Sequence, residues 1–252
     1  MSIAILTPVE IEKMRAAGAI ARATLLAVGA KLRPGISTAD IDRWVRQDTA
    51  LRGGKPSQLG YKGFPSSVCT SRNDVVCHGM PSPNDVLVDG DIINVDVTTE
   101  RSGYHGDTSI TFAIGPISPD AKHLLWVAEN AMFAAIAEVR EGARLGDVGH
   151  AVEAFAHREG CSVVRDFGGH GIGRTMHAPP HVNHFGPKGM GARLKAGMCI
   201  TVEPMLNLGK PEVRMDKDGW TVRTQDGSLS AQFEHTVLVT KTGSEVLTLR
   251  PA

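Results

Sequence analysis

Hydrophobic residues recur at helical spacing in four stretches of the chain. In the first, Thr7 precedes a proline and a glutamate at positions typical of a capped helix start, and apolar residues then recur every three or four positions up to Val28. Three more helices are predicted after Ser37, from Ser118, and over about 146–157. The chain is therefore predicted to carry two pairs of helices.

Short apolar runs after each helix pair predict strands. These runs lie at 68–72, 91–99, 108–114, 163–166, 198–204, 233–240 and 245–249. Because helices precede strands twice over, we predict an α+β protein with an antiparallel sheet covered by helices. The stretch 168–191 is rich in Gly, His and Pro and lacks periodicity, so it is predicted to be a functional loop.

The two halves of the chain resemble each other when one is shifted by a constant number of positions. The shift aligns glycines, apolar residues and acids, in the pairs Gly35/Gly142, Asp40/Asp147, Gly53/Gly160, Gly90/Gly197, Val95/Val202 and Asp96/Glu203. The alternative is that the match arises by chance, because any two α/β stretches have a similar pattern of glycine, apolar and acidic residues. Such a long period indicates homologous half-domains rather than a solenoid. We therefore predict one domain over 1–252, built of related halves at about 7–115 and 116–250.

Four acids interrupt strands that are otherwise apolar. Asp96 and Glu203 lie near the ends of their strands, Asp107 starts one, and Glu234 directly precedes another. Burying an unpaired carboxylate is costly, and no Lys or Arg adjoins these acids in the sequence. If the strands share one sheet, the acids converge, and two divalent cations would balance their charge.

Composition narrows the class of protein. The 252 residues carry a formal net charge of zero with scattered basic residues, so no nucleic-acid partner is predicted. The chain start lacks the pattern of a signal peptide, no apolar run reaches membrane-spanning length, and the four cysteines form no C-x-x-C pair. We expect a cytoplasmic protein without a membrane partner. A monomer is expected because no coiled-coil or repeat signal requires another chain.

His170 lies among glycines at 168–173. The spacing G-G-H-G-x-G differs from dinucleotide-binding and P-loop fingerprints, so a flavin or nicotinamide site is disfavoured. One imidazole with several carboxylates favours Mn, Fe, Co or Zn over Ca. A carboxylate that bridges two such ions holds them ~3.5–4 Å apart, as in two-metal hydrolytic sites.

Six motifs follow one another along nearly the whole chain. They are Cys77-His78-Gly79, Asn94-Val95-Asp96, His105-Gly106-Asp107-Thr108, Gly169-His170-Gly171-Ile172-Gly173, Val202-Glu203-Pro204 and Phe233-Glu234-His235-Thr236. Together they closely resemble the bacterial type I methionine aminopeptidases. The resemblance implies a pseudo-twofold α+β fold called pita-bread, in which two pairs of helices cover a curved antiparallel sheet. It also implies a catalytic domain that removes the initiator methionine from nascent polypeptides whose second residue is small.

The resemblance implies a role for each matching residue. The metal ligands would be Asp96, Asp107, His170, Glu203 and Glu234. Asp107 and Glu234 would bridge two divalent ions, with Asp96 completing one ion and His170 and Glu203 the other. A metal-bridged hydroxide would attack, with Glu203 as general base.

Two further histidines and a second cation site follow from the same resemblance. His177 would donate a hydrogen bond to the tetrahedral oxyanion, and His78 would bind the substrate backbone or protonate the leaving amine. A structural monovalent cation is expected near Asn73, Val75 and Ser230.

The resemblance also places a methionine-binding pocket. Its other walls would be Gln58, Tyr61, Phe64, Cys69, Met176 and Trp220, beside His78 and His177. Gln58 stands where many bacterial relatives carry Cys or another small residue, so its amide must find partners or point to water. Phe64 often corresponds to Tyr, and Met176 to Phe. One methylene is worth only ~1–3 kcal/mol in such a pocket, so preference for Met should be steep but finite.

Other histidines receive lesser roles. His181 and His184 are predicted to be loop residues near the cleft, and His235 to support the Glu234 carboxylate.

Two alternative functions stay open at this point. A proline-directed aminopeptidase of the same fold is the first, although the separate N-terminal domain of such enzymes is not expected here. A non-catalytic module that binds peptides or ribosomes is the second, although such relatives typically lose metal ligands. The preferred function predicts nascent N-terminal peptides as partners, with transient ribosome association. The chain's own Met1-Ser2 is a substrate sequence, so self-removal of Met1 is expected.

Overall fold

The structure, a computed structural model, describes residues 3–249 of the chain. The expected removal of Met1 and the predicted half-domain end near 250 lie outside these residues. No helix within the described range is long and apolar enough to cross a membrane.

Within residues 3–249, four α-helices form where the hydrophobic periodicity predicts them. They are α1 (Pro8–Gly29), α2 (Thr38–Leu51), α3 (Pro119–Ala137) and α4 (Leu145–Arg158), and a short 3₁₀ turn η1 spans Tyr61–Gly63. The hydroxyls of Thr7, Ser37 and Ser118 each accept a hydrogen bond from the backbone N–H of the third residue of the helix that follows. These caps satisfy N–H groups that a helix start otherwise leaves unpaired, so each helix begins at its predicted residue.

Antiparallel strands build one large sheet and two small ones. In the described part of the chain, the large sheet has nine strands in the order β1-β4-β5-β14-β9-β7-β8, with β2 also paired to β4 and β15 to β14. The small sheets have the orders β13-β10-β6 and β11-β12-β3. The bounds are β1 (Lys55–Pro56), β2 (Cys69–Arg72), β3 (Val75–Cys77), β4 (Ile92–Arg101), β5 (Tyr104–Ala113), β6 (Ser162–Val163), β7 (Gly169–Gly171), β8 (Ala178–Val182), β9 (Cys199–Val202), β10 (Met205–Asn207), β11 (Val213–Met215), β12 (Val222–Thr224), β13 (Ser230–Gln232), β14 (Glu234–Val239) and β15 (Ser244–Val246).

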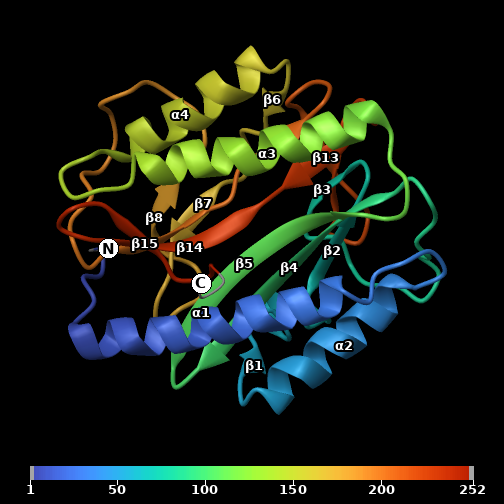
Figure 1. The fold of residues 1–252 in the computed structure, drawn as a ribbon, viewed down its shortest axis with the longest axis horizontal. Coiled ribbons are helices and arrows are strands. Elements are labelled where there is room, and N and C mark those ends of the chain that lie inside the picture. The colour runs from blue at the N-terminus through green and yellow to red at the C-terminus, as the bar shows by residue number, and fades with distance from the viewer. Residues whose placement is uncertain (1–2, 250–252) are drawn as a thin grey trace.

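The helices lie over the sheet as two pairs, α1 with α2 and α3 with α4 (Figure 1). One buried apolar cluster joins α1 and α2 to β4, and a larger one joins α3 and α4 to strands of the second half. Helix α1 crosses β5 very closely, because a Cβ atom on Gly106 would lie 2.4 Å from the backbone nitrogen of Gly18. Because glycine has no side chain, α1 can pack directly against the strand segment that carries Asp107.

Equivalent turns lead into the second helix of each pair. Gly35 and Gly142 have φ angles of +86° and +87°, and their N–H groups donate to the carbonyls of Leu87 and Leu194. Isolated bridges pair Ser37 with Val86 and Arg144 with Arg193 at matching positions. All these pairs obey the constant shift found in the sequence, so the repeated residues occupy repeated backbone geometry.

Some sequence-based boundaries are wrong. The stretch 168–191 is not one loop, because β7 and β8 lie within it and continue the large sheet beyond β9. The strands predicted at 163–166 and 245–249 are instead the short β6 and β15, which begin one residue earlier. The missed strands have two to five residues, too few to show the period-two alternation that identifies a strand.

Candidate metal centre

Five neighbouring strands of the large sheet each place one candidate ligand at the same cavity. In sheet order, β4 carries Asp96, β5 Asp107, β14 Glu234 and β7 His170, while Glu203 directly follows β9, which lies between β14 and β7. The cavity has a volume of about 250 Å³ and is lined by every residue predicted for the metals, for catalysis and for the pocket. Acids far apart in the sequence thus converge because their strands are adjacent.

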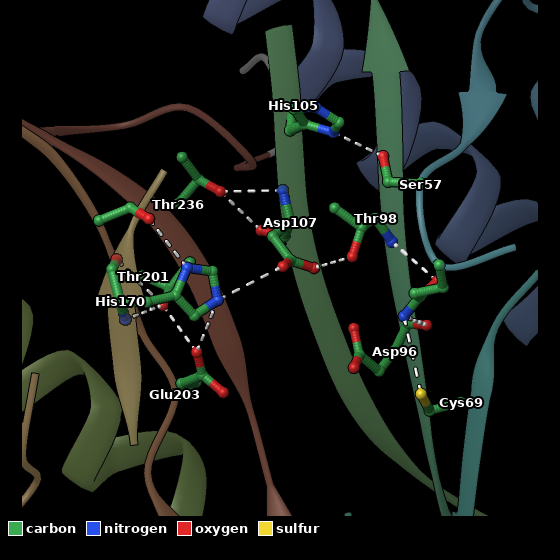
Figure 2. Close-up of polar contacts among 12 residues, drawn as sticks. Ser57, Cys69, Asp96, Thr98, His105, Asp107, His170, Thr201, Glu203 and Thr236 are labelled. Carbon is green, nitrogen blue, oxygen red and sulfur yellow. Dashed lines mark hydrogen bonds and ion pairs between the residues drawn. The ribbon is translucent and has the colours of Figure 1, made fainter. Parts of the chain in front are cut away.

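The ligand atoms approach one another closely (Figure 2). Asp107, His170 and Glu234 each offer an atom within 4.8 Å of the others. Nε2 of His170 lies 3.5 Å from Oε1 of Glu203 and 3.8 Å from Oδ2 of Asp107. Asp96 points from the neighbouring strand toward the same space. These separations are of the size that one or two cations with shared ligands would span.

Threonines on the same strands orient the acids. Thr98 donates a hydrogen bond to Oδ1 of Asp107 at 2.7 Å, and Thr201 donates to Oε1 of Glu203 at 2.6 Å. The Thr236 hydroxyl accepts from the Asp107 N–H at 2.9 Å and donates to its carbonyl at 2.8 Å. These supporting residues were missed in the sequence. The signal was present, because Thr98, Thr201 and Thr236 each stand two positions from an acid, on the same strand face.

Two more supporting residues hold Glu203. Gln232 donates to Oε2 of Glu203 at 3.1 Å, and the backbone N–H of Glu203 donates to Nε2 of His184 at 3.1 Å. His184 lies in the loop after β8 and near the cleft, as predicted, and it is buried beside Glu203. Burial lowers the pKa of His184 to about 3, so its ring is neutral and able to accept this bond.

His170 is arranged to present one nitrogen to the cavity. Its Nδ1 lies 3.1 Å from the carbonyl of Gly171, which accepts the Nδ1–H and leaves Nε2 with a free lone pair. Burial lowers the pKa of His170 to about 4, so the ring is neutral near pH 7. A neutral imidazole with a fixed tautomer is the form that ligates transition metals.

The buried acids carry charge that the protein itself does not balance. Burial raises the pKa of Glu203 to about 8, and it raises the pKa of Asp96, Asp107 and Glu234 as well. Oδ1 of Asp96 and Oε1 of Glu234 are buried and accept no hydrogen bond from the described residues. Among those residues, Lys62 is the only Lys or Arg lining the cavity. Orphaned carboxylate oxygens beside one imidazole fit divalent transition-metal ions.

The remaining predicted residues surround the ligands. His78 stands after β3 with a left-handed φ of +55°, its ring edge-on to Trp220 at 6.4 Å between centroids. His177 lies at the cavity mouth, 4.3 Å from the His170 ring and 5.0 Å from the Tyr61 ring. Partial burial lowers the pKa of His177, and the neighbouring His170 ring lowers it further.

The pocket walls are apolar on one side of the cavity. Phe64 packs edge-on against Trp220 at 5.1 Å, and Phe64, Cys69 and Met176 are all buried. Lys62, which the sequence reasoning did not single out, also lines the cavity. An apolar wall beside a carboxylate cluster allows a ligand to place an apolar group next to the candidate metal ligands.

Two other predictions, for His235 and His181, are wrong. The side chain of His235 does not support Glu234 as predicted, because its Nδ1 hydrogen-bonds the Thr248 hydroxyl at 2.8 Å instead. His181 lies on β8, paired with His170, rather than in a loop.

At the predicted monovalent-cation site, the Asn73 carbonyl accepts from the Ser230 N–H at 2.9 Å. Val75 follows two positions later on β3. The three residues are thus adjacent, and cation binding there stays a prediction.

Comparisons with known proteins match residues 12–241 to metallopeptidase family M24. The Escherichia coli methionine aminopeptidase is 46% identical over 251 residues, which cover 99% of this chain and 95% of that relative. The crystal structure of methionine aminopeptidase from Rickettsia prowazekii superposes with a TM-score of 0.97 at 45% identity, covering 98% of this chain and 100% of the other.

A more distant structure shares the fold alone. The Xaa-Pro dipeptidase from Bacillus anthracis has a TM-score of 0.78 at 22% identity, and the match covers 98% of this chain but 62% of that one. Together, these structures confirm the predicted pseudo-twofold, pita-bread α+β fold.

Proposed function

The chain belongs to metallopeptidase family M24, and we propose that it hydrolyses the N-terminal methionine from polypeptides whose second residue is small. Near-complete coverage at 46% identity to a methionine aminopeptidase supports this activity. The proline-directed alternative is not favoured, because the Xaa-Pro dipeptidase shares only the fold at 22% identity. The non-catalytic alternative is not favoured either, since all five ligand positions are present.

The observation that carries the proposal is the row of five ligands on adjacent strands. Asp96, Asp107, Glu234, Glu203 and His170 would hold the divalent ions, of which Co, Mn, Fe and Zn all suit the donor set. Such ions, when bound, supply Lewis-acid activation of the scissile carbonyl and of the attacking water.

The protein's own groups would move the protons. Glu203 would take a proton from the attacking water at its carboxylate, which Thr201 and Gln232 hold in place by hydrogen bonds at 2.6 and 3.1 Å. Burial raises the pKa of Glu203 to about 8, so neighbouring cations are needed to keep it ionised at neutral pH.

Two histidines would act on the peptide. His177 at the mouth would donate a hydrogen bond to the developing oxyanion. His78, which lines the same cavity, would bind the backbone beside the scissile bond or protonate the leaving amine. Both rings lie beside pocket aromatics that restrict their orientation.

The methionine side chain would occupy the apolar part of the cavity. Tyr61, Phe64, Cys69, Met176 and Trp220 line it. A volume of about 250 Å³ shared with the metal ligands leaves room for a small segment of peptide. The free amine at the chain end would lie near Asp96, which would restrict cleavage to the first residue.

The finer assignments extend this activity. We propose that the chain is one catalytic domain of two related halves, near 7–115 and 116–250, because equivalent turns obey one constant shift. All five ligands come from a single chain, so a monomer would hold a complete site. If nascent chains are the substrates, the protein would act in the cytoplasm and would contact ribosomes transiently. A monovalent cation beside Asn73, Val75 and Ser230 would be structural.

Hydrolysis of short peptides tests the activity. The purified protein should release Met from Met-Ala-Ser, lose this activity after chelation, and regain it with added Co or Mn. Cleavage of Xaa-Pro peptides in place of Met-Ala-Ser would favour the proline-directed alternative. No hydrolysis of either peptide with any metal would refute the proposed enzyme.

A further inference from the structure

Strand β4 changes partners beside the metal centre. On its outer edge, Glu100 and Thr99 pair with β1, whereas Asp96 and the residues before it pair with β2. The segment between the two partner strands, at Val97 and Thr98, has no paired strand residue on this edge. Backbone groups in such a gap need other partners, because buried N–H and C=O groups are costly when unpaired.

The side chain of Gln58 occupies this gap. Its Nε2 donates to the Asp96 carbonyl at 2.9 Å, and its Oε1 accepts from the Thr98 N–H at 3.4 Å. The preceding residue continues the β1 pairing, since the Ser57 N–H donates to the Thr98 carbonyl at 2.9 Å. The amide therefore takes the place of a missing backbone peptide, donating and accepting like a strand residue.

The two residues held by Gln58 both reach the metal centre. Asp96 is itself a candidate ligand, and its carboxyl group points into the cavity (Figure 2). Thr98 lies opposite Asp107 in the strand register, and its hydroxyl donates to Oδ1 of Asp107 at 2.7 Å. One side-chain amide thus holds the backbone of one candidate ligand, Asp96, and of Thr98, the residue whose hydroxyl orients a second candidate ligand, Asp107.

The second half of the chain shows a related arrangement. Glu203, which aligns with Asp96 under the internal shift, offers its carbonyl to Nε2 of Gln232 at 3.5 Å. Its N–H donates to His184 at 3.1 Å. In both halves, side chains satisfy the backbone of an acid where its strand loses regular pairing.

We propose that Gln58 is a positioning residue for the metal ion held by Asp96 and Asp107, rather than a polar contact for the substrate. The inference rests on the proposed function, in that the cavity must hold divalent ions. Both ends of the amide are used by β4, and only 6% of the residue is exposed. The pocket can therefore stay apolar despite a glutamine in its wall.

Two substitutions separate positioning from pocket shape. Gln58→Met keeps the approximate volume but removes both hydrogen bonds, whereas Gln58→Ala also opens the pocket and cannot clash. Loss of a residue that supports a metal ligand typically costs roughly 10–100-fold in metal affinity. Both variants should therefore bind Mn more weakly by this factor, and only Gln58→Ala should also raise KM for Met-Ala-Ser strongly.

The measurement is calorimetric titration of metal-free protein with Mn, after circular dichroism has shown wild-type helix content. Met176→Leu is the matched control, because Met176 lines the same cavity but its thioether has no N–H or O–H to donate to β4. This variant should alter KM without weakening Mn binding. If both Gln58 variants bind Mn within twofold of wild type, the positioning role of Gln58 is refuted. The proposed function would not be affected by that result. A wild-type protein that binds no divalent ion would instead refute the proposed metal site.

Discussion

The hydroxyl of Thr98 donates a 2.7 Å hydrogen bond to Oδ1 of Asp107, the residue directly opposite on the neighbouring strand. This bond uses one carboxylate oxygen and leaves Oδ2 facing His170, whose Nε2 lies 3.8 Å away. The cross-strand pair of Thr98 and Asp107 thus determines that Oδ1 of Asp107 bonds to Thr98 and that Oδ2 faces His170.

Removing that hydroxyl should weaken metal binding without unfolding the protein. Thr98→Val keeps the β-branched shape but loses the donor, so Mn affinity should fall roughly 10-fold or more. Titration calorimetry on metal-free protein measures the change. Thr98→Ser, which keeps a hydroxyl, is the control and should stay close to wild type. Equal affinities for the Val and Ser variants would show that the hydroxyl does not orient Asp107.

Loss of His170 should lower metal content and activity together. His170→Ala removes the only candidate imidazole ligand whose Nε2 faces Asp107 and Glu203 within the described residues. The loss in metal affinity should exceed the roughly 10–100-fold expected for a supporting residue. Elemental analysis beside Met-Ala-Ser hydrolysis tests this. Normal metal content in the variant would contradict the ligand role.

Loss of His177 should separate metal binding from turnover. His177 lies at the cavity mouth and is proposed as an oxyanion donor, so His177→Ala should keep its metals but lose on the order of 10²–10³ in kcat. Steady-state kinetics with parallel metal analysis measure both quantities. A wild-type kcat would refute the donor role, and loss of metal would assign His177 to the ligand set.

The metal-free protein should lose stability as pH rises from 6.5 to 8. Burial raises the pKa of Glu203 from 4.5 to about 8, so folding retains a proton that the unfolded chain has already released. This stabilisation is complete below pH 4.5 and is lost as pH rises through about 8. The pKa of Asp96 and of Glu234 shifts in the same direction.

The buried histidines act in the opposite direction, because their lowered pKa values reduce stability as pH falls through their ordinary value of 6.5. The pKa of His170 is lowered from 6.5 to about 4, so it destabilises the fold only as pH falls below 6.5. Each retained proton contributes a slope of about 1.4 kcal/mol per pH unit. Denaturant unfolding at several pH values measures the slope. It should shrink in Glu203→Gln, and a metal-free stability that rises over this range would contradict the buried-acid account.

The sequence predicted the acids and the helices because both leave local signals. Asp96 and Glu203 interrupt apolar runs, and Thr7 and Ser37 begin helices with recognisable caps. The resemblance to a known family supplied the fold name and the expected residue roles. Adjacency of the strands was less accessible, since the order β5-β14-β9 joins segments far apart in the chain.

The supporting contacts depended on burial and pairing that the sequence does not display. His181 and His184 look alike in the sequence, yet only His184 is buried and bonded to the backbone of Glu203. Gln58 looked like a polar intrusion in an apolar pocket, but a gap in strand pairing gives its amide two partners. Strands β7 and β8 were hidden because glycine and proline obscure the alternation of strand residues.

Anomalous X-ray diffraction from crystals grown with Mn or Co would locate the divalent ions. We expect anomalous peaks within the cavity, bonded to Asp107 and Glu234 together with Asp96 on one side and His170 with Glu203 on the other. An empty cavity at saturating metal, or peaks bound only elsewhere on the protein, would contradict the proposed metal site.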